Sequence, residues 1–127
     1  MIAVDTSALM AVVLNEAAAD DCIGALEDQV QVLISAGTVA EALIVSARRR
    51  VQREMVDLID EYGFEVLPVT RSIALQIGAA YEKWGKGRHA AELNMGDCFA
   101  YVVAKENDCP LLFVGKDFSR TDVISVL

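Results

Sequence analysis

The chain has 127 residues, a length that fits one domain over residues 1–127 and allows a core without disulfides or structural metals. Its net charge of −8 argues against sequence-independent nucleic-acid binding through phosphate neutralisation, although a carboxylate-rich site that loads cations would reverse the local sign. The hydrophobic fraction of 54% is high for a globular domain. This excess predicts an apolar surface for a homodimer or a partner peptide.

The sequence gives no sign of export or of a membrane span. No apolar run reaches the about 18–20 residues that cross a bilayer, and the N-terminus lacks the basic segment of a secretory signal. Cys22, Cys98 and Cys109 form no CxxC pair, so we expect buried free thiols, and the lone His89 cannot build a zinc site. We therefore expect a cytoplasmic protein.

The first half of the chain alternates short apolar runs with stretches of helical period. Asp5, Thr6 and Ser7 can cap a helix that Asn15 ends, and Thr38 can cap another, with Glu41 as its capping-box partner. The pattern predicts strands at residues 2–4 and 30–34, and helices at residues 5–15, 16–27, 38–50 and 51–62.

The second half repeats this alternation. Gly63 is a natural helix stop, Thr70 can cap a helix that ends near Trp84, and Pro110 ends a helix that starts at residues 94–97. Strands are predicted at residues 64–69 and 111–114, a basic loop at 85–89, a turn at 115–118, and a short fifth strand at 123–127. Strands that alternate with helices predict an α/β fold, with a central parallel sheet of four or five strands and helices on both faces.

Four acidic residues are predicted near the carboxyl ends of the strands, where open α/β sheets carry their sites. Asp5 follows the first strand, and Glu41 lies in the first turn of the helix after the second strand. Asp97 starts the helix that leads into the fourth strand, and Asp117 lies just past that strand. If strands one, two and four are neighbours, the four carboxylates converge.

Each acid also has a purely structural interpretation. Asp5 would cap a helix, and Glu41 would complete the capping box of Thr38. Asp97 would interact favourably with the dipole at a helix N-terminus, and Asp117 would be an ordinary turn residue. No single acid decides between the two interpretations. Their joint placement after strands and at helix starts favours a shared site.

Convergence of these acids would be unfavourable without a counter-charge. Two unit charges about 5 Å apart repel by roughly 3 kcal/mol at an effective dielectric of about 20. Mg²⁺ prefers oxygen ligands, and a bound divalent cation can activate water for attack on a phosphodiester. The sequence contains neither GxxxxGK[ST] nor GxSxG, so no phosphate-binding loop or serine nucleophile competes with this interpretation.

Four stretches of the chain resemble the PIN-domain family, and the VapC toxins in particular. They are VDTSAL at residues 4–9, TVAEAL at 38–43, LNMGDCFAY at 93–101 and GKDFSRTDV at 115–123, and their order and spacing match over the whole chain. The resemblance implies a three-layer PIN fold and a Mg²⁺- or Mn²⁺-dependent endoribonuclease that acts as the toxin of a toxin–antitoxin pair.

The resemblance also assigns roles to residues. It implies that the catalytic and metal-binding acids are Asp5, Glu41, Asp97 and Asp117, with support from Thr6, Ser7 and Asp122. Lys116 departs from the family pattern, in which Asn or Asp is common at this position. Because a lysine lowers the local negative charge, we expect at least one metal and do not assign a second.

Partners follow from the same resemblance. It implies a VapB-like antitoxin, whose arginine would insert among the carboxylates in a charge-assisted contact, and a homodimer. Lys86, Arg88 and Arg48 are candidate contacts for the RNA substrate. The alternative for Arg48 and its neighbours is a solvated helix end.

Three other functions compete with the toxin ribonuclease. A nuclease of the same fold could act on DNA or on a particular nucleic-acid structure, and an inactive PIN-like module could serve binding alone. A receiver domain of signalling proteins has a similar size, but it needs an aspartate after its third strand. Here the third strand runs into Pro68-Val69-Thr70-Arg71, which contains no acid.

Overall fold

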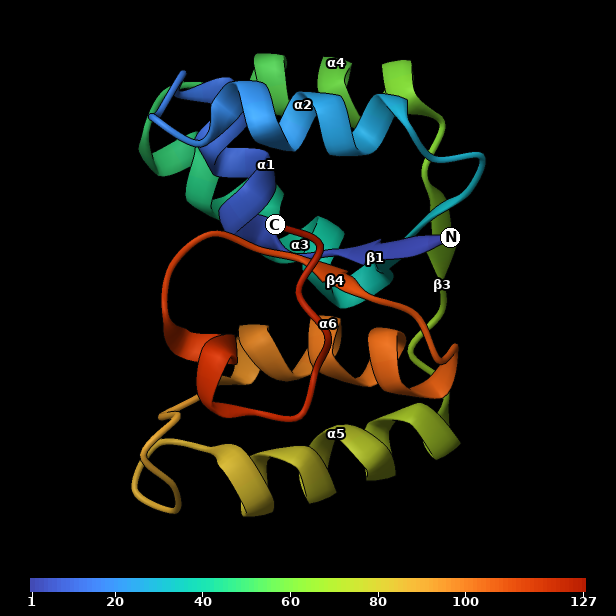
Figure 1. Ribbon diagram of the computed structural model, residues 1–127, viewed down its shortest axis with the longest axis vertical. Coiled ribbons are helices and arrows are strands. Elements are labelled where there is room, and N and C mark those ends of the chain that lie inside the picture. Colours follow the sequence, from blue (N-terminus) through green and yellow to red (C-terminus); the bar gives the residue numbers. More distant parts are fainter.

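The computed structural model describes residues 1–127 and is built around a parallel sheet (Figure 1). Its strands are β1 (Ile2–Val4), β2 (Val32–Ser35), β3 (Glu65–Leu67) and β4 (Leu111–Leu112). Their order is β3-β2-β1-β4, and all three pairings are parallel. Strands β2, β1 and β4 are therefore neighbours, as convergence of the acidic residues requires.

The central strands are buried on both faces. In β1, Ala3 pairs with Leu33 and Leu111 and contributes with them to the hydrophobic cluster on one face. Ile2 and Val4 belong to the cluster on the opposite face, because successive side chains of a strand alternate. Burial on both faces explains why the strands appear in the sequence as short continuous apolar runs.

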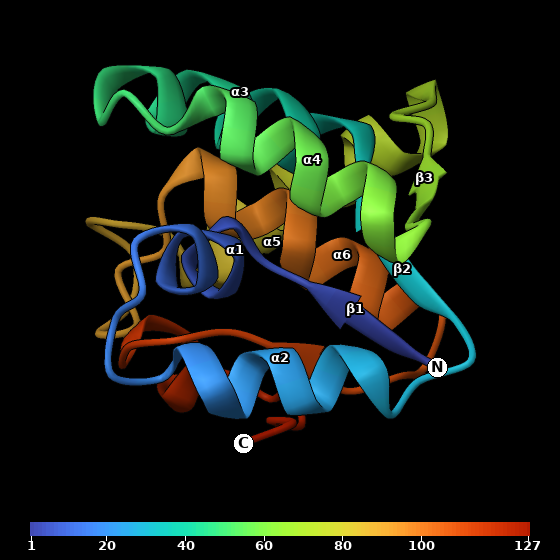
Figure 2. The ribbon, with the colours of Figure 1, turned by 90° about the horizontal axis from the view of Figure 1, so that it is seen from above.

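Six α-helices and one 3₁₀ turn surround the sheet. They are α1 (Thr6–Val13), α2 (Ala19–Glu27), α3 (Ala36–Arg48), α4 (Gln52–Tyr62), α5 (Arg71–Trp84), α6 (Met95–Glu106) and η1 (Asp117–Arg120). Helices α1, α2 and α4 cover one face, while α6 contacts β1, β2 and β4 on the other face and carries α5 on its outer side (Figures 1 and 2). The three-layer α/β architecture is confirmed. None of the helices combines the length and apolar character that spanning a membrane would need.

The predicted cap of α3 is wrong. Strand β2 runs directly into the helix, and Ser35 is the N-cap, since its Oγ accepts a hydrogen bond from the Gly37 N–H at 3.1 Å. Thr38 lies inside the first turn, fully buried, and its Oγ1 has no partner. Glu41 therefore does not complete a capping box with Thr38, and it lies in the second turn of the helix, past the first turn in which it was predicted.

The predicted fifth strand is also wrong, although the chain does return to the sheet there. The C-terminal segment makes only an isolated parallel bridge between Leu111 and Ser125. Leu111 N–H donates to the Ile124 carbonyl at 2.8 Å, and Val126 N–H donates to the Leu111 carbonyl at 3.1 Å. Because β4 has only two residues, it offers a fifth strand too short an edge for a regular ladder.

Candidate active site

Asp5 lies directly after β1 and caps α1. Its side chain is 3% exposed, and its Oδ2 accepts hydrogen bonds from the Ser7 N–H at 3.0 Å and the Ser7 hydroxyl at 2.7 Å. Its other oxygen, Oδ1, is buried and has no hydrogen-bond partner. A buried acceptor without a partner is costly, so this oxygen marks a position where an added cation or donor would stabilise the protein.

Ser7 ties Asp5 to the end of β4. The Val114 N–H donates to Ser7 Oγ at 3.0 Å, which leaves the Ser7 hydroxyl proton for Asp5. This chain fixes the Asp5 carboxylate relative to the segment that leads from β4 to Asp117. The sequence predicted only a supporting hydroxyl here, because the contact spans 107 positions and no local pattern reports it.

Asp97 lies in the first turn of α6, where it forms a capping box with Asn94. The Asn94 N–H donates to Asp97 Oδ2, and the Asp97 N–H donates to Asn94 Oδ1, both at 2.9 Å. The carboxylate is 9% exposed. Asp5 and Asp97 thus resemble each other: each uses Oδ2 to cap its own helix, and this bond orients the whole carboxylate.

Glu41 reaches the same region from α3. The Thr6 hydroxyl donates to Glu41 Oε1 at 2.6 Å, so the residue next to Asp5 holds one of its oxygens. The other oxygen, Oε2, lies against Gly96, the residue before Asp97. Glu41 is therefore placed between the first turns of α1 and α6.

Asp117 is the first residue of η1 and is exposed. Its charge raises the pKa of Asp97, which places it within electrostatic reach of the buried acids. No three His, Cys, Asp or Glu side chains lie close enough together to hold a metal ion as they stand. The structure therefore brings the four acids to one end of the sheet without closing a complete ligand set.

The charges of these acids are not neutralised by the protein. The pKa of Asp5 is raised to about 7, mainly by burial and to a smaller extent by the charges of Asp97 and Glu41, against the hydrogen bonds from Ser7. Burial also raises the pKa of Asp97 to about 6 against its hydrogen bond from Asn94, with added repulsion from Asp117 and Glu41. Neither salt bridge of the chain involves any of the four acids. Oxygen donors, repelling charges and an unpartnered Oδ1 fit a hard divalent cation.

Asp122 has a different environment. It accepts a hydrogen bond from the Tyr101 hydroxyl at 2.7 Å and pairs with Lys105 at 3.2 Å. Partial burial would raise its pKa, but the bonds from Tyr101 and Lys105 and the charge of Lys105 outweigh it, so the pKa is lowered. None of the four acids is among the groups that shift this pKa.

The three candidate RNA contacts lie in two places. Arg48 and Glu41 line one groove of about 400 Å³ along α3. Lys86 and Arg88 lie in the loop after α5, where Arg88 pairs with Glu82 at 3.5 Å. Arg120 of η1 donates to the Ala90 carbonyl at 3.4 Å, so this loop is linked to the turn that carries Asp117.

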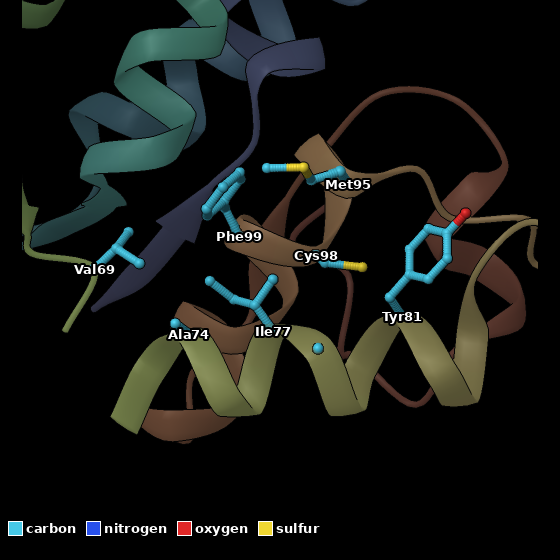
Figure 3. A pocket seen from close by; sticks show the side chains of 8 residues that line it. Val69, Ala74, Ile77, Tyr81, Met95, Cys98 and Phe99 are labelled. Carbon is cyan, nitrogen blue, oxygen red and sulfur yellow. The ribbon is translucent and has the colours of Figure 1, made fainter. Parts of the chain in front are cut away.

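An apolar groove of about 570 Å³ runs between α5 and α6 (Figure 3). Its lining consists of Val69, Ala74, Ile77, Gly78, Tyr81, Met95, Cys98 and Phe99. Met95 and Phe99 also line the groove that contains Glu41, so the two depressions adjoin. Met95 is 66% exposed, so an apolar side chain is accessible where the two grooves meet.

The fold and the site define an α/β domain with a carboxylate site at the carboxyl ends of its strands. The PIN domain family model matches residues 2–124. Ribonuclease VapC30 of Mycobacterium tuberculosis is 38% identical over 126 residues, which cover 97% of this chain and 96% of that protein. Ribonuclease VapC of Mycolicibacterium smegmatis is 36% identical over 126 residues, with 97% and 98% covered. The chain belongs to the PIN-domain family and, within it, to the VapC ribonucleases.

Solved structures agree on the fold. The Mycobacterium tuberculosis toxin VapC20, which cleaves the sarcin–ricin loop, superimposes with a TM-score of 0.78 at 21% identity, covering 99% of this chain and 98% of that one. A chain of a toxin–antitoxin complex from Klebsiella pneumoniae superimposes with a TM-score of 0.72 at 16% identity, covering 99% and 97%.

Proposed function

We propose that the chain is a divalent-metal-dependent endoribonuclease that acts as the toxin of a toxin–antitoxin pair. The observation that carries the proposal is the unneutralised acidic site, in which Asp5 Oδ1 is buried without a partner. The identity to proteins named as VapC ribonucleases, over nearly the whole chain, supports RNA as the substrate.

Asp5 and Asp97 would hold Mg²⁺, or Mn²⁺ in its place, and Glu41 and Asp117 would complete the set of metal-binding acids around them. Mg²⁺ is commonly held by one or two carboxylates and keeps several waters, which suits a site with two fixed, buried carboxylates. The cation would supply activation of water and stabilisation of charge on the leaving oxygen. At least one metal is proposed, because Lys116 reduces the negative charge beside Asp117.

The chain's own residues would orient the site and bind the substrate. The caps of α1 and α6 fix the carboxylates of Asp5 and Asp97, and the Thr6 hydroxyl holds Glu41. This preorganisation matters because a small misplacement of reacting groups costs rate. Arg48, Lys86 and Arg88 are proposed to contact RNA phosphates around the acidic site.

We also propose a VapB-like antitoxin and a homodimer as partners. An antitoxin arginine could satisfy Asp5 Oδ1 with its guanidinium and so compete with metal. The fold shared with a chain of a toxin–antitoxin complex supports such a partner. The apolar groove between α5 and α6 supports a contact between protein chains, and the free protein is expected to sediment as a dimer. A monomer at micromolar concentration would contradict the dimer.

The test of the nuclease is incubation of the purified, partner-free protein with total bacterial RNA in Mg²⁺, Mn²⁺ or EDTA. Asp5→Asn is the control, with a mass spectrum of the preparation to exclude bound antitoxin. Discrete fragments are expected that disappear with EDTA and in the variant. In a parallel incubation with duplex DNA, cleavage of the DNA in place of RNA would favour a DNA-directed nuclease, and no cleavage of either by the antitoxin-free protein would favour an inactive module.

A second measurement detects the cation without RNA. At a Mn²⁺ concentration of about 100 times the Kd, binding should stabilise the fold by about 2.7 kcal/mol. The melting temperature of the wild-type protein should rise accordingly, and that of Asp5→Asn should not. An equal rise in both proteins would remove Asp5 from the metal site.

A further inference from the structure

Gly96 is the second residue of α6 and makes an unusually close contact. A Cβ at this position would overlap Oε2 and the carboxyl carbon of Glu41. The backbone itself does not require glycine here, because Gly96 is not among the glycines with positive φ. In a helix interior alanine is favoured over glycine, so the helix alone would prefer a larger residue. The absence of a side chain at Gly96 therefore serves the approach of Glu41.

This approach determines where the Glu41 carboxylate lies. Oε2 lies against Gly96, while Oε1 accepts the hydrogen bond from Thr6 at 2.6 Å. The two contacts hold Glu41 between the residues that follow Asp5 and precede Asp97. We propose that Gly96 is a positioning residue, whose missing side chain lets Glu41 complete the acidic site and so sets the affinity for a divalent cation. This inference rests on the proposed metal-dependent function.

Gly37 provides a matched control on the facing helix. A Cβ at Gly37 would overlap the ring of Phe99, so α3 and α6 approach closely there as well. The Phe99 ring is partly buried and moves only as one rigid group on a short stem, so it yields less easily than a carboxylate at the end of a long side chain, and overpacking of that kind destabilises the fold. The Glu41 carboxylate, by contrast, is the end of a flexible side chain and can move aside. Gly96→Ala should therefore displace Glu41 and keep the fold, whereas Gly37→Ala should lower the melting temperature.

The test is calorimetric titration with MnCl₂ alone, which needs no RNA. Gly96→Ala should weaken Mn²⁺ binding by about 10–100-fold, the range found when groups that orient metal ligands are removed. Its metal-free melting temperature should equal or exceed that of the wild type. In the Glu41→Ala background, Gly96→Ala should cause no further loss. Unchanged Mn²⁺ affinity of Gly96→Ala, or the same loss with and without Glu41, would overturn the proposal.

A crystal structure of metal-free Gly96→Ala separates this proposal from the proposed function. If the wild type neither binds Mn²⁺ nor cleaves RNA, the proposed function fails, but the position of Glu41 can still be observed. A displaced carboxylate that has lost its bond to Thr6 supports the positioning role. If the Glu41 carboxylate keeps its wild-type position in Gly96→Ala, the positioning role of Gly96 is overturned.

Discussion

Carboxylates lie at two places along α6, a cluster at its N-terminal end and the single Asp122 further along, and they differ in how their charge is compensated. At its N-terminal end, Asp97 lies with Asp5 and Glu41, and the pKa values of both aspartates are raised. Further along, Asp122 contacts Tyr101 and Lys105, and its pKa is lowered. Aspartate side chains thus have raised pKa values near one end of α6 and a lowered pKa value further along the same helix.

The difference shows which acids need an external cation. Asp122 has a resident ammonium group 3.2 Å away, so its charge is already compensated. Asp5 has hydrogen-bond donors on Oδ2 alone, its charged neighbours repel it, and its buried Oδ1 has no hydrogen-bond partner. A metal or an antitoxin arginine is therefore expected at the N-terminal end of α6. Asp117 and Asp122 are close in sequence, but only Asp117 is among the charges that raise the pKa of Asp97.

The largest expected effect comes from Asp97→Asn. The amide can still accept the hydrogen bond from Asn94, but it removes a charge that a cation would need. A bound metal supplies several kcal/mol of transition-state stabilisation, so RNA cleavage should fall by at least about 100-fold. Cleavage rates on a defined RNA in Mg²⁺ would measure this. This loss of cleavage would show that the acids at the N-terminal end of α6, unlike the compensated Asp122, are needed for activity.

The control for Asp97→Asn is its metal-free melting curve. Loss of a buried, repelled charge should leave the melting temperature unchanged or raise it. Full residual cleavage would remove Asp97 from the site. A large drop in melting temperature would instead show that the negative charge of Asp97 mainly stabilises the N-terminus of α6.

The sequence predicts the site better than it predicts the details around it. Asp5, Glu41, Asp97 and Asp117 could be selected because parallel strands bring their carboxyl ends to one edge, and β2, β1 and β4 are indeed neighbours. The position of each acid in the chain indicated convergence only on the condition that these strands are neighbours, and the roles of the acids came from the family resemblance. Which of them is buried, and which oxygen is free, depends on three-dimensional packing.

The failures concern choices that depend on tertiary contacts. Both Ser35 and Thr38 can act as N-caps, and the position at which β2 ends in the structure identifies Ser35 as the cap. The hydrogen bond from Tyr101 to Asp122 joins residues 21 positions apart, so no spacing rule reports it, and the supporting role of Asp122 stays a prediction. Gly96 could be noticed only as a helix residue with poor propensity, and its partner Glu41 is invisible without the structure.

A smaller effect is expected from pH. Since the folded-state pKa values of Asp5 and Asp97 are about 7 and about 6, against an ordinary value of 3.8, the folded protein binds more protons than the unfolded chain between about pH 4 and pH 7. The metal-free protein should therefore lose stability as pH rises through this window, by up to about 1.4 kcal/mol per pH unit for each group.

Urea unfolding of the metal-free protein at pH 5 and pH 7.5 would measure this dependence. Asp5→Asn should remove a large part of it. Saturating Mn²⁺ should reverse the trend, because the metal competes with protons for the same carboxylates. Equal pH dependence of the free energy of unfolding in the wild type and in Asp5→Asn would contradict the prediction, since the pKa of Asp5 would then not be raised in the folded protein.

The smallest effect is expected from Asp122→Asn, the counterpart of Asp97→Asn in the compensated group. The amide oxygen can still accept the Tyr101 hydroxyl, but the ion pair with Lys105 is lost. Because both side chains of this pair are 45% exposed, the free energy of unfolding should fall by less than about 1 kcal/mol, and salt should reduce the difference. Urea unfolding at two salt concentrations would measure it, with RNA cleavage and Mn²⁺ affinity expected to stay unchanged. A loss of cleavage as large as that of Asp97→Asn would return Asp122 to the active site, because a compensated carboxylate would then be acting on substrate or metal.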